Sequence, residues 1–105
     1  MQLVSGAHKH YDWGDHEFLY GFVGAPLSSK PLAEIWFGTH ADGPAVLSAT
    51  QEALANVAGP LPFMVKFLSA ASPLSLQVHP TATQARAGFE REESAGIPAS
   101  SPQRI

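Results

Sequence analysis

The sequence predicts a mainly β fold of short strands and turns, with a few short helices. Nine glycines and nine prolines in 105 residues exceed average usage, and both residue types interrupt long helices. Residues 32–37 and 74–79 alternate their side chains as strands do, and residues 63–68 form a short, almost wholly apolar run. These observations argue against a helical bundle.

The composition is that of one small folded domain with few charges. Charged residues make up 14%, hydrophobic residues 45%, and the formal net charge is −3. This is too apolar for a disordered tail, and it lacks the basic character that indicates a nucleic-acid partner. The absence of cysteine excludes disulfides and thiol chemistry. With no secretory signal and no apolar run of about 20 residues, we expect a cytoplasmic protein without a membrane partner.

The first half of the chain is predicted to contain a turn, a strand and a short helix. Residues 11–15 are typical of a turn, because Asp and Gly adopt the backbone angles that turns need. Pro31 and Gly38 bound the strand at 32–37. Its alternation defines two faces, Leu32, Glu34 and Trp36 on one, and Ala33, Ile35 and Phe37 on the other. A short helix is expected around residues 50–57.

The second half is predicted to form two strands and a longer helix. Residues 63–68 and 74–79 are expected to pair antiparallel across the connector 69–73, and Pro80 ends the second strand. Thr81 and Gln84 have the spacing of a capping box. A helix should follow over residues 82–95, with Gly96 as its C-cap.

One face of the strand at 74–79 carries Ser75, Gln77 and His79. Neighbours on that face lie roughly 6.5–7 Å apart, so two of them can converge on one ion. The alternative is a solvent-facing polar surface. Taken alone, a Gln–x–His pair is a weak metal signal, because neutral Gln is a poor ligand.

Two charged residues interrupt apolar strands. Lys66 must reach water, a carboxylate or a ligand, because burying an unpaired ammonium is costly. Whether it shares a face with Gln77 depends on the strand register, which the sequence leaves open. Glu34 is either a surface carboxylate, paired with a lysine, or a carboxylate in a cavity.

Four segments carry a resemblance to a known family. They are Tyr-Asp-Trp-Gly at 11–14, Ala-Glu-Ile-Trp-Phe-Gly-Thr-His at 33–40, residues 61–71 running on through 73–80, and Gln84, Ala85, Gly88, Phe89 and 96–98. In these segments the chain is similar to the N-terminal part of a type I mannose-6-phosphate isomerase, a zinc enzyme of the cupin class. The third segment is the most specific.

The resemblance implies a cupin-type (jelly-roll) β-barrel with short helices, incomplete in residues 1–105. It implies an aldose–ketose isomerase that interconverts mannose 6-phosphate and fructose 6-phosphate through an enediol, with zinc as a Lewis acid. Gln77 and His79 would be two of four zinc ligands. The residues that would meet the phosphosugar substrate are Lys66, Ser75, Trp13 and Glu34.

The sequence also departs from the family's pattern. In the family a Glu ligand, an Asn-His-Lys-Pro-Glu string and a further His ligand follow the segment that matches residues 96–98. Since this sequence has none of them, we expect a truncated N-terminal part that is inactive alone. The alternatives are a non-catalytic metal- or sugar-binding cupin module and a purely structural fragment. The catalytic base and the oligomeric state are not assigned.

Overall fold

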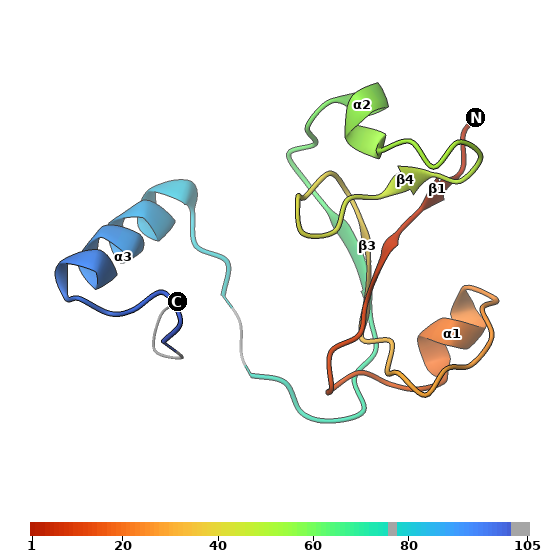
Figure 1. The fold of residues 1–105 in the computed structure, drawn as a ribbon, viewed down its shortest axis with the longest axis horizontal. Helices are drawn as coiled ribbons and strands as arrows, with labels where there is room; N and C mark the ends of the chain where they lie inside the picture. The colour runs from red at the N-terminus through yellow and green to blue at the C-terminus, as the bar shows by residue number, and fades with distance from the viewer. Residues whose placement is uncertain (76–77, 102–105) are drawn as a thin grey trace. The chain divides into compact units, whose positions relative to one another are not determined.

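The computed structural model describes residues 1–75 and 78–101 of the chain. The chain divides into two compact units, Met1–Leu74 and Ser75–Ile105. The first unit contains five strands and two short helices, and the described part of the second contains one longer helix (Figure 1). These small antiparallel sheets with few helices confirm the predicted mainly β class. No helix in the described ranges is long and apolar enough to cross a membrane.

A three-stranded antiparallel sheet forms the centre of the first unit. Its strands are β2 (Ala7–Lys9), β3 (Glu34–Phe37) and β5 (Val65–Leu68), in the order β2-β3-β5. Beside it, β1 (Val4–Ser5) pairs antiparallel with β4 (Val46–Leu47). The strands predicted at 32–37 and 63–68 are therefore confirmed in their C-terminal parts.

The predicted pairing of residues 63–68 with 74–79 is wrong for the described residues. β5 pairs with β3, and residues 74, 75, 78 and 79 form no strand, while Leu76 and Gln77 lie outside the described residues. The reason lies in the connector after β5, which runs along residues 13–15 instead of turning back. There the Asp15 amide donates to the Ser69 carbonyl (3.1 Å), and the Ala71 amide donates to the Trp13 carbonyl (2.8 Å).

The turn at residues 11–15 is confirmed, because the Gly14 amide donates to the Tyr11 carbonyl at 2.9 Å. A short helix that the sequence analysis did not predict, α1 (Phe18–Phe22), follows the turn. The carboxylate of Asp15 accepts hydrogen bonds from the Glu17 and Phe18 amides. This side chain therefore satisfies free N–H groups at the start of α1.

The other two helices were predicted, one of them with different bounds. α2 (Leu54–Ala58) begins later than expected because residues 47–52 form a tight loop, in which the Leu47 amide donates to the Glu52 carbonyl (2.8 Å). α3 (Ala82–Ser94) has Thr81 as its N-cap, and the predicted capping box with Gln84 is present. Ala95 is the C-cap, and Gly96 follows it with a φ of +68°.

The core of the first unit lies between α1 and β3. Its buried side chains are Leu19, Tyr20, Leu32 and Ile35. The Tyr20 hydroxyl donates to the Lys30 carbonyl at 2.9 Å, so the one polar atom of this cluster is satisfied. Burial of Ile35 holds one face of β3 against this core and turns Glu34 and Trp36 to the opposite face.

Candidate functional site

Glu34 is the one charged residue that is buried among the described residues, with 7% of its surface exposed. A buried carboxylate is costly unless it is paired and hydrogen-bonded. The indole Nε1–H of Trp36 donates to Glu34 Oε2 at 2.6 Å, and Lys66 Nζ lies 3.9 Å from Glu34 Oε1. Of the interpretations from the sequence, pairing with a lysine is correct and surface exposure is wrong.

Lys66 reaches this carboxylate because of the strand register. It lies directly opposite Trp36 in the β3–β5 pair, and opposed residues of antiparallel strands face the same side. Its ammonium nitrogen lies 4.6 Å from the centre of the Trp36 ring. The Lys66 side chain remains 35% exposed, so the ammonium also faces solvent.

A second lysine, on β2, completes the arrangement. Lys9 lies opposite Glu34 in the β2–β3 pair, and its Nζ lies 4.3 Å from the centre of the Trp36 ring. The Lys9 ammonium donates to the backbone carbonyl of Asp42. Together Lys9, Glu34, Trp36 and Lys66 form what we call the Trp36 cluster.

The loop after β3 covers the Trp36 cluster from one side. The His40 ring meets the Trp36 ring edge-on, with centroids 5.7 Å apart. Gly43 is buried, and a Cβ there would lie 3.0 Å from both Lys9 Cε and Trp36 Cε3. A glycine at position 43 therefore allows the loop to approach the indole and the Lys9 side chain this closely.

The charges of the Trp36 cluster are two ammonium groups and one carboxylate. His8 adds no charge to the sheet at neutral pH, because burial lowers its pKa and the neighbouring His10 lowers it further. The net positive charge and the partly exposed Lys66 suit the binding of an oxygen-rich, anionic molecule. Glu34 and Lys66 were predicted from the sequence, whereas Lys9 and the role of Trp36 were not, since only the register of β2 and β5 on β3 brings these residues together.

Trp13 is the third predicted site residue of this unit, and its position is fixed by hydrogen bonds to its backbone carbonyl and by one ring contact. Its carbonyl accepts hydrogen bonds from Ala71 (2.8 Å) and Ser72 (3.4 Å), and its ring stacks on Tyr11 with centroids 5.6 Å apart. Trp13 therefore lies where the chain leaves the sheet after β5.

The remaining predicted site residues belong to the second unit. Ser75 and His79 are exposed, and Gln77 lies outside the described residues. Within the described ranges, no three His, Asp or Glu side chains are grouped closely enough to hold a metal ion. The imidazole of His79 is a suitable zinc ligand by its chemistry, but a zinc site needs at least three protein ligands. Zinc binding by Gln77 and His79 stays a prediction.

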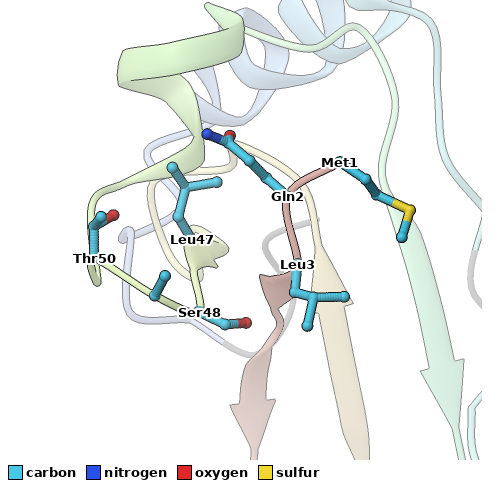
Figure 2. A pocket seen from close by; sticks show the side chains of 7 residues that line it. Met1, Gln2, Leu3, Leu47, Ser48 and Thr50 are labelled. Carbon is cyan, nitrogen blue, oxygen red and sulfur yellow. The ribbon is translucent and has the colours of Figure 1, made fainter.

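A hollow of about 450 Å³ lies elsewhere in the first unit, between the residues that precede β1 and the turn that follows β4 (Figure 2). Its lining residues are Met1, Gln2, Leu3, Leu47, Ser48, Ala49 and Thr50. It contains none of the predicted site residues and no ionisable side chain. The Trp36 cluster is therefore the better candidate for chemistry.

Comparison with known proteins gives one consistent result. A sequence profile of the family "Phosphomannose isomerase type I, catalytic domain" matches residues 1–96. The mannose-6-phosphate isomerase of Salmonella typhimurium is 36% identical over 99% of this chain and 32% of its own length. The mannose-6-phosphate isomerase of Escherichia coli is 34% identical, also over 99% of this chain and 32% of its own length. This chain thus spans about a third of the length of these curated relatives.

Solved structures agree with the sequence matches. A crystal structure of mannose 6-phosphate isomerase bound with zinc and yttrium superposes with a TM-score of 0.74 at 32% identity, over 99% of this chain and 31% of that one. The apo form from Salmonella typhimurium gives a TM-score of 0.73 at 33% identity, with the same coverage.

Proposed function

Because the chain belongs to the type I phosphomannose isomerase family, we propose that residues 1–105 are the N-terminal part of an enzyme that interconverts mannose 6-phosphate and fructose 6-phosphate. The match over residues 1–96 carries this proposal. Since the chain spans 32% of the Salmonella relative, we assign the activity to the full-length protein and not to these residues alone.

We also propose that the antiparallel sheets are part of an incomplete cupin-type β-barrel. Among the residues that the structure describes, β5 is an exposed edge strand, which supports this, because a sheet edge is a natural place for further strands to add.

In the proposed reaction, a proton moves between C1 and C2 of the sugar through an enediol. Negative charge develops on the sugar oxygens during this step, and nearby cations stabilise it. We assign this role within the chain to Lys66, whose ammonium is partly exposed. Glu34 orients Lys66 from the buried side, since its Oε1 lies 3.9 Å from Lys66 Nζ. The ion pair between Glu34 and Lys66 supports a role for both residues at the substrate.

We further propose that Gln77 and His79 contribute two ligands to a zinc site whose other ligands lie outside this chain. When bound, the zinc would act as a Lewis acid toward the sugar oxygens. The imidazole of His79 supports this assignment, because it is exposed and imidazole nitrogen is a common zinc ligand. The zinc-bound mannose 6-phosphate isomerase among the structural neighbours supports it as well.

Trp13 and Ser75 complete the proposed substrate-binding set. The hydrogen bonds from Ala71 and Ser72 to the Trp13 carbonyl support the assignment, because they anchor the connector that leads to Ser75. An indole beside a sugar also supplies an apolar surface for its C–H groups.

The experiment that tests the proposed function is an assay of the full-length protein. We expect the purified, zinc-loaded protein to convert mannose 6-phosphate to fructose 6-phosphate, measured with a coupled assay. Mannose without the phosphate is the matched control substrate and should not react. A full-length protein that retains zinc but converts neither sugar phosphate would contradict the proposal and favour a non-catalytic sugar-binding module.

A further inference from the structure

We propose that Trp36 is a positioning residue that keeps the ammonium of Lys66 close to Glu34 without a hydrogen bond between them. The donors of Lys66 then remain available to an oxygen of a bound ligand. Identifying that ligand as the phosphosugar rests on the proposed function, whereas the arrangement itself rests only on the Trp36 cluster.

Trp36 holds the Glu34 carboxylate through its indole N–H. Glu34 and Trp36 are two residues apart on β3, so their side chains share one face. The indole N–H donates to Oε2 at 2.6 Å, a short distance for an N–H···O hydrogen bond. Because Glu34 is 7% exposed, little water is available to replace this donor. The indole therefore determines the orientation of the carboxylate.

The Lys66 ammonium lies near both the Glu34 carboxylate and the Trp36 ring. Lys66 Nζ lies 3.9 Å from Glu34 Oε1, whereas N–H···O hydrogen bonds are about 2.7–3.2 Å long. The same nitrogen lies 4.6 Å from the centre of the Trp36 ring, within the range of a cation–π interaction. Attraction to the ring thus competes with attraction to the carboxylate. Among the described residues, the Lys66 ammonium donates no hydrogen bond, so its N–H groups are available.

Lys66, and not Lys9, has donors available for a ligand. Both ammonium groups lie over the Trp36 ring, at 4.6 and 4.3 Å from its centre. Lys9, however, donates to the carbonyl of Asp42. Its donor capacity is partly used within the protein, and the loop passes close to its side chain, since a Cβ added at position 43 would lie 3.0 Å from Lys9 Cε. Lys66 is the lysine that pairs with Glu34 and also reaches solvent.

The arrangement can be tested on the 105-residue chain by NMR, because the sequence contains three lysines, Lys9, Lys30 and Lys66. Protons above an aromatic ring resonate upfield, so we expect the Cε protons of Lys9 and Lys66 to lie upfield of those of Lys30. Trp36→Leu should remove both upfield shifts, and Trp13→Leu is the matched control that should leave them. Equal shifts for all three lysines in the wild-type chain would overturn the arrangement.

The positioning role can be tested by kinetics of the full-length protein. Trp36→Phe keeps an aromatic face but removes the N–H donor, and we expect kcat to fall about tenfold with KM within about twofold. In a Lys66→Met background the same substitution should change kcat by less than about twofold, because Trp36 acts through Lys66. Zinc content should stay unchanged in all variants, and Lys30→Met is the matched control for loss of a lysine.

The outcomes separate this inference from the proposed function. Additive losses in the double variant, or an unchanged kcat in Trp36→Phe, would overturn the positioning role while the isomerase function stands. If the wild-type protein has no isomerase activity, the proposed function fails, and the lysine spectra still decide whether Trp36 holds Lys66.

Discussion

Gly14 packs directly against Ala33, so that a Cβ at position 14 would lie 2.7 Å from the nitrogen, Cα and Cβ of Ala33. This contact joins the turn at residues 11–15 to the residue before Glu34. The bridge between Gly14 and Ala70 adds the connector after β5 to the same junction. Three segments that are distant in sequence therefore meet beside the Trp36 cluster, and each contact at this junction constrains the site.

We expect Gly14→Ala to destabilise the first unit by about 1–3 kcal/mol, because the methyl group has no space beside Ala33. Urea unfolding followed by Trp fluorescence would measure this change. Gly21→Ala is the matched control, since nothing lies within 4 Å of a Cβ there and residue 21 is inside α1. It should stabilise the chain by about 0.5–1 kcal/mol, because alanine favours a helix over glycine. A Gly14→Ala variant as stable as wild type would contradict the contact.

Lys66→Met should destabilise the chain by about 1 kcal/mol, because it leaves the buried carboxylate of Glu34 without its cation. The effect is smaller than for a fully buried pair, since Lys66 is 35% exposed. Lys30→Met should change the stability by less than about 0.5 kcal/mol. In the full-length protein we expect Lys66→Met to lower turnover and to leave zinc in place. Loss of zinc from this variant would argue against a role of Lys66 at the substrate.

His79→Ala in the full-length protein is expected to abolish isomerase activity and zinc retention. Removing one ligand opens the zinc site and weakens binding. Metal content by mass spectrometry and the coupled isomerase assay would test both effects. His16→Ala is the matched control, because His16 is an exposed loop residue outside the proposed site. Full zinc occupancy with near-normal turnover in His79→Ala would rule out the ligand assignment.

The 105-residue chain by itself is expected to bind zinc more weakly than micromolar and to show no turnover of mannose 6-phosphate. Its proposed zinc ligands are one imidazole and one neutral amide, which is fewer than a zinc site requires. Calorimetry with zinc and the isomerase assay would measure these properties. Submicromolar affinity, or any turnover above a buffer control, would show that the rest of the protein is dispensable.

Asp15 is expected to make the stability of the first unit depend on pH in acid. Hydrogen bonds from the amides of Phe18 and Glu17 lower the pKa of Asp15 in the folded state. Its contribution is therefore fully present above the ordinary aspartate pKa and is lost as the pH falls through the lowered value. Urea unfolding of wild type and Asp15→Ala should show a stability difference at pH 7 that shrinks below about pH 4. A stability difference that is the same at pH 7 and below about pH 4 would contradict this role of Asp15.

Local signals in the sequence predicted the elements whose hydrogen bonds are local. The capping box of Thr81 and Gln84 and the glycine at position 96 predicted α3 to within a residue at its ends, because all their partners lie within a few positions. Alternation predicted that Glu34 and Trp36 share a face, since the period of a strand is a property of the backbone. Four segments together indicated the family, the most specific being residues 61–71 running on through 73–80, and the match over residues 1–96 confirms it.

The pairing of strands was decided only by the tertiary structure. The sequence alone favoured residues 74–79 as the partner of residues 63–68, because they are adjacent along the chain. The structure instead pairs β5 with β3, since the connector after β5 forms hydrogen bonds with the turn around Trp13. This register places Lys66 opposite Trp36 and Lys9 opposite Glu34. A one-residue slip of either strand would turn its lysine to the other face, and no local pattern in the sequence distinguishes these registers.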